Sequence, residues 1–410
     1  MMRFGLRAAA IMTILATELA ALTGTAAATA SAPGAAPAAG AEVVADAVDP
    51  DAAELQAALD RLTAAGAPAA LAQVRVGDKA WSGASGVRDI HTRQAARPGD
   101  RYRIASITKA MVATVVLQLV DEGRLGLDDA VGRHLPGLLP AAHEKVTISQ
   151  LLDHTSGIPN YFDVLYPTGT DAELERNRFR YVAPEELVRR AVEQPPATAG
   201  QFTYSNTNYV LLGLIAESTT GRPLASELDR RVLRPAGMKD TSYPTLSPFL
   251  AGPHVNGYRQ DGKGRLVDTT VYTPSVWGAA AGVVSTSGDV NRFFRALSDG
   301  TLLPPARLAD MRAVNEAGYG LGVVGGGDIC PAAPGDRVWG NMGNGFGYRS
   351  QSWSSPDGRR QVTFGWTVTV PGVVGPPAVE KAVQEFLVTA LAATCGPAAP
   401  DPGTKLEAAR

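Results

Sequence analysis

Strand-like segments stand near both ends of this 410-residue chain, and helical segments fill most of the sequence between them. Two short runs early in the chain are joined by Gly77-Asp78, and two late runs flank the turn Ser355-Pro356-Asp357-Gly358. Both arrangements are typical of β-hairpins. The four runs are 72–76, 80–87, 348–353 and 361–370. We therefore predict an antiparallel sheet built from the N- and C-terminal segments, with a mainly helical lobe inserted at about 105–275.

Apolar residues recur at helical spacing in several segments beside and between these runs. The segments are 51–65, 104–122, 209–218, 289–297 and 377–393. The segment 104–122 is apolar enough for a long buried helix, and Gly123 follows it as a residue that often ends helices. Residues 124–200 hold many prolines and short helical pieces but no convincing strand. The predicted fold class is α+β, with helices flanking an antiparallel sheet.

The first 32 residues have the composition of a secretory signal peptide. Arg3 and Arg7 precede an apolar run at 8–22, and small residues suited to cleavage follow. This run of about 15 residues is shorter than the roughly 20 that span a membrane, so we expect cleavage and no stable membrane anchor. The expected product is secreted and extracellular, either free or associated with the cell wall.

Beyond this leader, composition divides the chain into three parts. Residues 33–50 are rich in Ala, Pro and Gly and are predicted to be a disordered linker. Residues 51–397 form one folded domain, for which a hydrophobic content of 45% supplies a large core. Residues 398–410 are predicted to be a flexible tail. The net charge is -2 and no basic run stands out, so we expect no nucleic-acid partner.

The chain has two cysteines, Cys330 and Cys395. In an exported protein an even pair indicates a disulfide, whereas two buried free thiols are the alternative. A disulfide here would close a loop of 395 − 330 = 65 residues, which contributes about 4 kcal/mol on the chain-entropy model. Two cysteines and five scattered histidines do not form a metal-ligand pattern, so we predict neither a metal nor a cofactor.

Ser106 and Lys109 are a candidate nucleophile and its neighbour. Three residues apart on a helix, they share one face, so the amine can lie beside the hydroxyl. At a helix N-terminus, free backbone N–H groups and the helix dipole favour developing negative charge. A serine hydroxyl needs such a neighbour to accept its proton before it can attack. The spacing alone is a weak signal, because a serine here can also be a helix N-cap.

A second motif strengthens this interpretation. Tyr204-Ser205-Asn206 lies 98 residues after Ser106 and is the only Tyr-x-Asn in the chain. With both motifs, the sequence resembles the serine β-lactamase and penicillin-recognising DD-peptidase superfamily, in particular its class C β-lactamase and secreted D-alanyl-D-alanine carboxypeptidase branch. The resemblance covers most of residues 52–396. It is carried by the segments 103–109, 117–123, 135–140, 151–157, 204–209 and 318–322.

The resemblance implies a β-lactamase/transpeptidase-like fold and a set of residue roles. Ser106 attacks a carbonyl and becomes an acyl-enzyme. Tyr204, its phenol pKa lowered by Lys109, acts with Lys109 as the base and later returns the proton to the leaving group. Asn206 orients Lys109 and the substrate amide. The backbone N–H groups of Ser106 and Asn344 form the oxyanion hole.

Two further features follow from the same resemblance. Cys330 and Cys395 fall where the secreted carboxypeptidases carry their disulfide. His154, in the segment 151–157, is a family signature residue, for which we expect a structural role in a turn rather than a part in the chemistry.

The third motif of the family departs from its usual form. The family carries Lys-Thr-Gly or His-Thr-Gly on the strand that lines the site, whereas this chain has Asn341-Met342-Gly343. Gly343 is retained, which suits close approach of a substrate to the strand. Asn341 and Gly343 are the candidate substrate-binding residues of this strand. Asn341 can hydrogen-bond but cannot attract an anion or hold Tyr204 as a phenolate. Met342 removes a hydroxyl that binds the substrate carboxylate in the peptidases.

A second departure concerns arginines. The carboxypeptidases place arginines after the segment that corresponds to 320–322, where they grip the free C-terminal carboxylate of the substrate. Here the run 323–327 carries no charge. Loss of such a charged hydrogen bond costs about 1.5–3 kcal/mol, so we expect poor discrimination for a free D-alanine terminus. Arg337 and Arg349 are the candidates that could compensate.

The predicted function is therefore an exported serine hydrolase, with residues 51–397 as the catalytic domain. It is D-alanyl-D-alanine carboxypeptidase- or β-lactamase-like. The alternatives are an esterase or amidase acting on neutral small acyl compounds, and a penicillin-binding protein without turnover. Expected partners are a small-molecule or peptidoglycan-peptide substrate and β-lactams, and the protein is expected to be a monomer.

Overall fold

The structure is a computed structural model that describes residues 51–330, 337–370 and 375–395. The predicted signal peptide (1–32), linker (33–50) and tail (398–410) lie outside the described residues.

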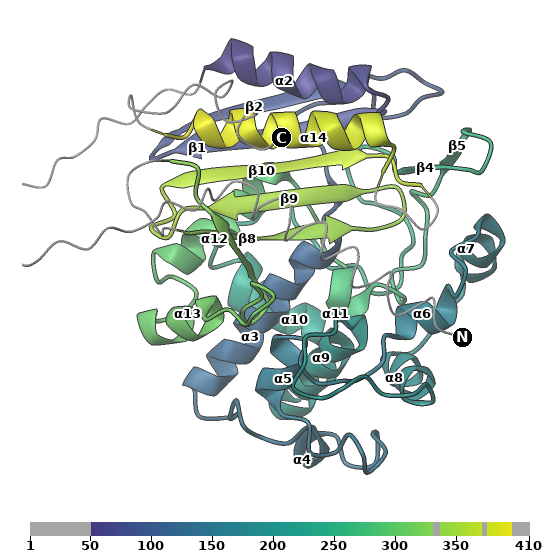
Figure 1. Cartoon of the computed structure of the whole chain (residues 1–410), viewed down its shortest axis with the longest axis vertical. Helices are drawn as coiled ribbons and strands as arrows, with labels where there is room; N and C mark the ends of the chain where they lie inside the picture. The colour runs from purple at the N-terminus through teal and green to yellow at the C-terminus, as the bar shows by residue number, and fades with distance from the viewer. Residues whose placement is uncertain (1–50, 331–336, 371–374, 396–410) are drawn as a thin grey trace, which may run out of the picture.

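One six-stranded antiparallel sheet forms the upper half of the molecule in Figure 1, with the strand order β2-β1-β10-β9-β8-β7. Its strands are β1 (Ala69–Val76), β2 (Lys79–Gly86), β7 (Val324–Gly327), β8 (Arg337–Asn344), β9 (Arg349–Ser354) and β10 (Arg360–Thr367). The N-terminal hairpin pairs directly with the C-terminal one, because β1 lies against β10 from Ala69↔Thr367 to Val76↔Arg360. The predicted sheet built from both ends of the chain is confirmed.

Two helices cover the outer face of this sheet, and they come from opposite ends of the chain. Helix α2 (Ala52–Ala64) and helix α14 (Pro377–Ala392) lie side by side there (Figure 1). Asp51 caps α2, because its carboxylate accepts hydrogen bonds from two backbone N–H groups of the first turn. Leu59, Phe364 and Phe386 belong to the apolar cluster between the helices and the sheet. Burial of this cluster attaches both ends of the domain to one scaffold.

The inserted helical part lies under the other face, and helix α3 (Thr108–Asp121) runs through it (Figure 1). Every α3 residue from Thr108 to Leu117 is buried, as expected for a helix that is apolar all round. Helix α9 (Asn206–Thr220) packs beside α3 and is likewise buried from Thr207 to Ala216. The other helical elements are η1 (Ala105–Ile107), α4 (Val131–His134), α5 (Ile148–Leu152), α6 (Tyr161–Leu165), α7 (Asp171–Asn177), α8 (Pro184–Val192), α10 (Leu224–Leu228), η2 (Asp229–Leu233), α11 (Gly278–Ala281), α12 (Ser287–Ser298) and α13 (Pro305–Arg312).

Two short ladders join the helical part to the sheet. Strand β3 (Tyr102–Arg103) pairs with β6 (Val284–Ser285), and β4 (Tyr258–Gln260) pairs with β5 (Leu266–Asp268). The sequence did not predict these strands, because two or three residues are too few to show an alternating pattern. The β3–β6 ladder matters for function, since it holds the segment that leads into Ser106.

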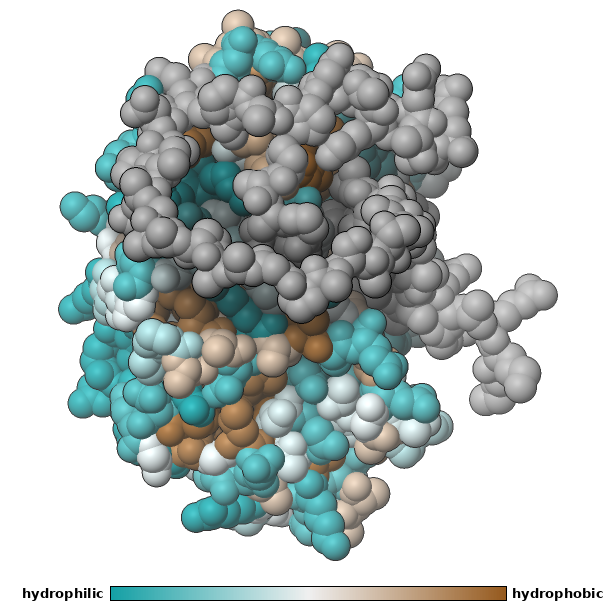
Figure 2. Space-filling model, turned by 60° about the vertical axis from the view of Figure 1, so that its left-hand side comes forward, coloured by the Kyte–Doolittle hydropathy of each residue, from teal (hydrophilic) through white to brown (hydrophobic). Residues whose placement is uncertain are grey.

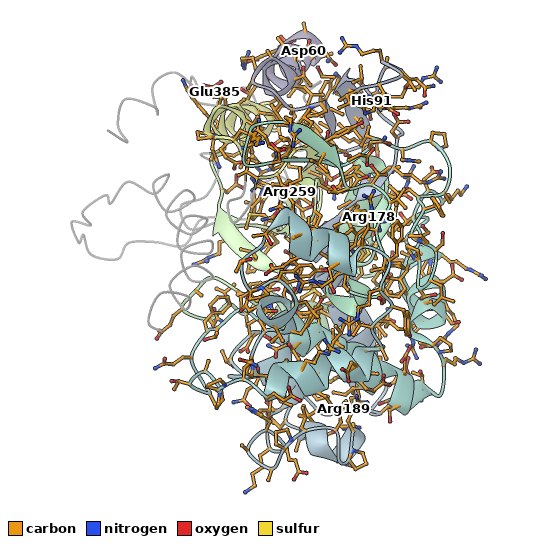
Figure 3. All side chains as sticks on the ribbon, turned by 90° about the vertical axis from the view of Figure 1, so that its right-hand side faces the viewer. Asp60, His91, Arg178, Arg189, Arg259 and Glu385 are labelled. Carbon is orange, nitrogen blue, oxygen red and sulfur yellow. A yellow bond between two sulfur atoms is a disulfide. The ribbon has the colours of Figure 1, made fainter. Side chains whose placement is uncertain are left out.

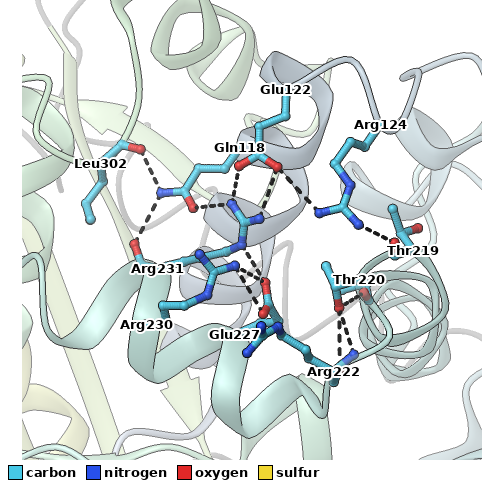
Figure 4. Close-up of polar contacts among 11 residues, drawn as sticks. Gln118, Glu122, Arg124, Thr219, Thr220, Arg222, Glu227, Arg230, Arg231 and Leu302 are labelled. Atoms are coloured by element: carbon cyan, nitrogen blue, oxygen red, sulfur yellow. Dashed lines mark hydrogen bonds and ion pairs between the residues drawn. The ribbon is translucent and has the colours of Figure 1, made fainter.

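A buried ion-pair network closes the far end of α3 (Figure 4). The guanidinium of Arg231 lies 2.5 Å from the carboxylate of Glu122 and 2.5 Å from that of Glu227. Glu227 is fully buried and also accepts a hydrogen bond from Arg230 at 2.9 Å. The amide of Gln118 donates to the carbonyl of Arg231 at 3.2 Å. The network therefore fixes α10 and η2 against the end of α3.

Replacing Glu227 with leucine should destabilise the protein by about 3 kcal/mol, because it leaves the buried Arg231 with only a half-exposed partner. The matched control is Glu186→Leu, which breaks an exposed pair with Arg190 on α8 and should change stability much less. Urea unfolding followed by circular dichroism measures both. Equal unfolding midpoints for the Glu227 variant and the wild type would contradict a stabilising role for the network.

Cys330 and Cys395 form a disulfide, with their Cα atoms 5.4 Å apart. The pairing is confirmed, and the alternative of two free thiols is excluded. The bond joins the segment after β7 to the end of α14. Within the described residues, no helix is both long and apolar enough to cross a membrane. Figure 2 shows hydrophilic and hydrophobic residues interspersed over the described part of one face.

Candidate active site

Ser106 stands on a sharp turn between a strand and a helix. Strand β3 ends at Arg103, Ala105 takes a left-handed φ of +47°, and α3 begins two residues after Ser106. A left-handed backbone is costly for a residue with a Cβ and is found where the surrounding structure enforces it, often at functional sites. The turn leaves the Ser106 side chain half-buried, at the start of a buried helix.

The structure brings the four predicted catalytic side chains together. The hydroxyl of Ser106 lies 2.9 Å from the hydroxyl of Tyr204 and 3.1 Å from Nζ of Lys109. Nζ also lies 2.8 Å from Oδ1 of Asn206 and 2.9 Å from the carbonyl oxygen of Ala280. Ala280, on α11, is the member of this cluster that the sequence did not predict.

Lys109 is fully buried, and burial holds its pKa well below the ordinary range for lysine. Among the described residues, no carboxylate forms an ion pair with it. A buried amine without a counterion favours its neutral form, which carries a lone pair and can accept a proton. Lys109 is therefore suited to act as the base for Ser106.

The pKa of the Tyr204 phenol differs from the expectation. Burial raises its pKa above the ordinary value, and the hydrogen bond with Ser106 only partly opposes that effect. Lys109 Nζ lies 4.9 Å from the centre of the Tyr204 ring, and its hydrogen bonds go to other groups. The prediction that Lys109 lowers the phenol pKa is therefore wrong. Tyr204 is a protonated phenol that can donate to Ser106 or to a leaving group.

His154 holds the segment that carries Tyr204. It has a left-handed φ of +63°, and its carbonyl accepts a hydrogen bond from the N–H of Thr203 at 2.8 Å, consistent with the predicted turn role. The imidazole does more, because Nδ1 accepts from the N–H of Ser205 at 3.3 Å and the ring packs 4.3 Å from the ring of Tyr204. Burial is the largest cause of the low pKa of His154, so the imidazole is neutral.

The predicted oxyanion donors lie on adjoining segments. In the antiparallel pair β8–β9, Gly345 donates to Tyr348, so Asn344 falls at the alternate position where the N–H points away from β9. Strand β7 pairs with β8 only as far as Gly340, so this edge of β8 is not covered by β7 at Asn344. A Cβ added to Gly345 would lie 3.5 Å from Cβ of Ala105, next to Ser106.

The family model named Beta-lactamase matches residues 51–374. The chain belongs to the beta-lactamase family. This confirms the predicted resemblance and, together with the sheet and its helices, the predicted fold class. The protein is thus a serine hydrolase of the β-lactamase fold.

Three relatives illustrate the range of the beta-lactamase family. A solved D-stereospecific amidohydrolase from Streptomyces sp. is 32% identical, with a TM-score of 0.71, and the match covers 81% of this chain and 98% of that one. Esterase EstB from Burkholderia gladioli is 29% identical over 364 residues, which is 79% of this chain and 87% of the esterase. Protein flp from Staphylococcus aureus is 31% identical over 205 residues, and the matched part is 49% of this chain and 39% of flp.

In the third motif of this beta-lactamase family member, the side chain of Asn341 forms hydrogen bonds within the protein. Asn341 is 4% exposed; its amide nitrogen donates to the carbonyl of Gly322 at 2.9 Å, and its amide oxygen accepts from the N–H of Met342 at 2.7 Å. Asn341 therefore ties β8 to the loop before β7. Both contacts are internal to the protein, and a role of Asn341 in substrate binding stays a prediction.

The structure differs from the expectations for Gly343 and for position 342. A Cβ on Gly343 would lie 2.2 Å from the carbonyl oxygen of Ile104, so the glycine permits close packing of β8 against the segment before Ser106 rather than approach of a substrate. Met342 points to the opposite face of β8, because successive strand residues alternate, and it packs against the cluster under α2 and α14. A hydroxyl at position 342 would therefore face away from Ser106.

Of the two arginines considered as substitutes for the missing cation, one is engaged elsewhere and the other is exposed. Arg349 forms an ion pair with Glu380 of α14 and lies over the ring of Trp366, on the outer face of the sheet. Arg337 is exposed at the start of β8. Arg103 is buried and donates to three backbone carbonyls. In the described parts of the chain, Lys109 is the only lysine or arginine whose side chain is hydrogen-bonded to Ser106.

An aromatic cluster that the sequence did not predict adjoins this site. It consists of Phe162, Tyr166, Tyr272, Trp277 and Phe346. Phe346 follows Asn344 by two residues and is half-buried, with its ring 4.8 Å from that of Trp277 and 5.7 Å from that of Phe162. The cluster thus places apolar ring surface next to the predicted oxyanion strand.

A separate cavity of about 330 Å³ lies between α7 and the β4–β5 hairpin. Arg178 and Arg259, which line it, are labelled near each other in Figure 3. Arg259 is paired with Asp171, and Arg178 with Glu175, so both guanidinium groups of this cavity have carboxylate partners within its lining. Tyr272 lines the cavity and also belongs to the aromatic cluster, so one side chain separates the two features.

Proposed function

We propose that this protein is a serine amidohydrolase and esterase that forms an acyl-enzyme on Ser106 and prefers amides and esters whose leaving group carries no carboxylate. The observation that supports this preference is the third motif. The amide of Asn341 is hydrogen-bonded to Gly322 and Met342, Arg349 is paired with Glu380, and Arg337 is exposed at the start of β8. A free C-terminal carboxylate would lose its water without gaining a charged partner, which disfavours its binding.

The first half-reaction follows from the contacts of Ser106. Neutral Lys109 accepts the hydroxyl proton as Oγ attacks the carbonyl carbon of the substrate. The negative charge that develops on the substrate oxygen is held by the backbone N–H groups of Ser106 and Asn344. The phenol of Tyr204, 2.9 Å from Oγ, gives its proton to the departing nitrogen or oxygen, and the proton held by Lys109 replaces it.

The second half-reaction reverses these proton transfers. Water attacks the ester on Ser106 and gives a proton to the same Lys109–Tyr204 pair. Oγ then leaves as the hydroxyl of Ser106 and takes up a proton. Each cycle consumes one water and regenerates the starting protonation state, so no cofactor is required by this scheme.

The acyl part of the substrate is proposed from two sources. The ring surface of Phe346 and Trp277 suits an apolar or aromatic acyl side chain beside the strand that holds the oxyanion. The D-stereospecific amidohydrolase relative supports a D-configured amino acid amide as the starting substrate. We also propose that the protein is exported, which the Cys330–Cys395 disulfide supports. The expectation of a monomer stays a prediction.

The decisive test compares one peptide in two forms, D-Ala-D-Ala with a free C-terminal carboxylate and the same peptide as its C-terminal amide. We expect kcat/KM for the amide to exceed that for the carboxylate form by about tenfold or more. D-phenylalanine amide and its L isomer test the acyl side chain and its configuration in the same assay. A tenfold preference for the carboxylate form would instead support the carboxypeptidase prediction. Stoichiometric labelling by a fluorescent penicillin without turnover of any substrate would support a penicillin-binding protein.

A further inference from the structure

We infer that Asn160 is a positioning residue. It fixes the orientation of the Asn206 side-chain amide and thereby directs the lone pair of Lys109 Nζ at Ser106. Asn160 lies just before the short helix α6, on a loop that contacts the start of α9. Its Oδ1 lies 3.1 Å from the backbone nitrogen of Asn206 and 3.3 Å from the side-chain nitrogen of that residue. No motif of the sequence singles it out.

The orientation of the Asn160 amide follows from groups that cannot be reversed. Oδ1 faces the backbone N–H of Asn206 and, at 3.4 Å, the backbone N–H of Phe162, and both of these groups can only donate. The atom of Asn160 that faces them must therefore be its oxygen. Its nitrogen then points to the carboxylate of Asp163 at 3.4 Å, which can only accept when ionised.

The orientation of the Asn206 side-chain amide is fixed in the same way. Its side-chain atom that faces the oxygen of Asn160 must be the nitrogen, because two oxygens cannot share a hydrogen bond. The oxygen of Asn206 consequently faces Lys109 at 2.8 Å. An unassisted side-chain amide could adopt either orientation, so Asn160 selects one of two states.

Lys109 completes the sequence of contacts. Asn206 Oδ1 and the carbonyl of Ala280 are both acceptors, so Nζ must donate one N–H to each. A neutral amine has two N–H bonds and one lone pair, and the remaining direction is that of Ser106 Oγ at 3.1 Å. The lone pair therefore meets the hydroxyl proton of the nucleophile. If Asn206 were reversed, its NH₂ would occupy the lone pair, and Ser106 would lose its base.

The inference rests on the use of Lys109 as the base in the proposed function, and the test separates the two. Asn160→Leu removes the acceptor with little change in size. It should lower kcat for a p-nitrophenyl ester by about 10- to 100-fold, the cost of one misplaced catalytic hydrogen bond, with KM changed less than about threefold. The control is Thr170→Val, which removes the cap of α7 and touches none of these residues; it should leave kcat unchanged.

The conservative test exchanges the amide and the carboxylate in the double variant Asn160→Asp/Asp163→Asn, with Asp163→Asn alone as its control. The carboxylate introduced at position 160 still accepts both hydrogen bonds, so kcat at high pH should stay within about threefold of the wild type. Its charge favours the protonated form of Lys109, so the acidic limb of the rate profile should move to higher pH. The other titratable groups around Lys109 are Tyr204, Tyr209 and His154, which neither variant changes.

The protonation state of Lys109 can be measured directly without a substrate. The ¹³Cε resonance of Lys109, assigned with Lys109→Met, should titrate at higher pH in the double variant than in the wild type. Unchanged kcat in Asn160→Leu, or equal titration of Lys109 in the double variant and the wild type, would overturn the inference. If the wild type hydrolyses no substrate but the titration shifts as expected, the proposed function fails and the positioning role stands.

Discussion

Replacing Ser106 with alanine should lower hydrolysis of every substrate by at least about 10⁴-fold, because no other described side chain can take its place beside Lys109 and Tyr204. The alanine removes only Oγ from a half-buried position at the start of α3, so folding should be retained. The wild type incubated with an activated ester or a fluorophosphonate should gain one acyl or phosphonyl group. Intact-protein mass spectrometry followed by peptide mapping would place it on Ser106.

The matched control is Ser218→Ala on α9, where the hydroxyl donates to the carbonyl of His134 far along the helix from the site. This variant should keep both labelling and turnover. Labelling of Ser106→Ala at the wild-type rate, with its circular dichroism spectrum unchanged, would show that another residue is the nucleophile. The hydrogen-bonded side chains around Ser106 would then have a structural role instead of a catalytic one.

The architecture was predictable where a pattern extends over several residues. The turn at 355–358 and the two runs that flank it predicted β9 and β10, and apolar periodicity predicted α2, α3, α9, α12 and α14. Strand β7 is Val-Gly-Gly-Gly, and in β8 the β-branched and aromatic residues are only the adjacent pair Val338 and Trp339, so neither strand shows an extended strand-like pattern. Tertiary pairing with β9 makes β8 a strand, and no local signal carries that information.

The site was predictable for residues in motifs and not for those that meet only in three dimensions. Ser106 and Lys109 were candidates from their spacing, and the family resemblance carried by the motifs in order implied the roles of all four, with Tyr204 and Asn206. Asn160, Ala280 and the aromatic cluster come from segments distant in the sequence that carry no motif of their own. Which face of β8 carries the Met342 side chain depends on strand register, because a shift of one residue moves every side chain to the opposite face. The pKa of Tyr204 depended on burial, which sequence does not report.

Replacing Lys109 with methionine should lower kcat for a p-nitrophenyl ester by about 10³- to 10⁴-fold, since general-base assistance is lost while the oxyanion donors remain. Methionine has a similar length and no lone pair of comparable basicity. Lys145→Met, at an exposed position in the loop before α5, is the control and should retain wild-type kcat. Retention of more than about a tenth of wild-type kcat by Lys109→Met would assign the base to Tyr204.

The pH dependence distinguishes the same two bases. In the free enzyme Lys109 must be neutral to accept a proton, so kcat/KM should rise with pH through the Lys109 pKa, which burial holds below the usual range for lysine. Above that pKa the rate should level off, and the Tyr204 phenol keeps its proton because its own pKa is raised. The rising limb should be absent from the residual activity of Lys109→Met. If the limb persists there unchanged, it belongs to another group, and the neutral-lysine mechanism is excluded.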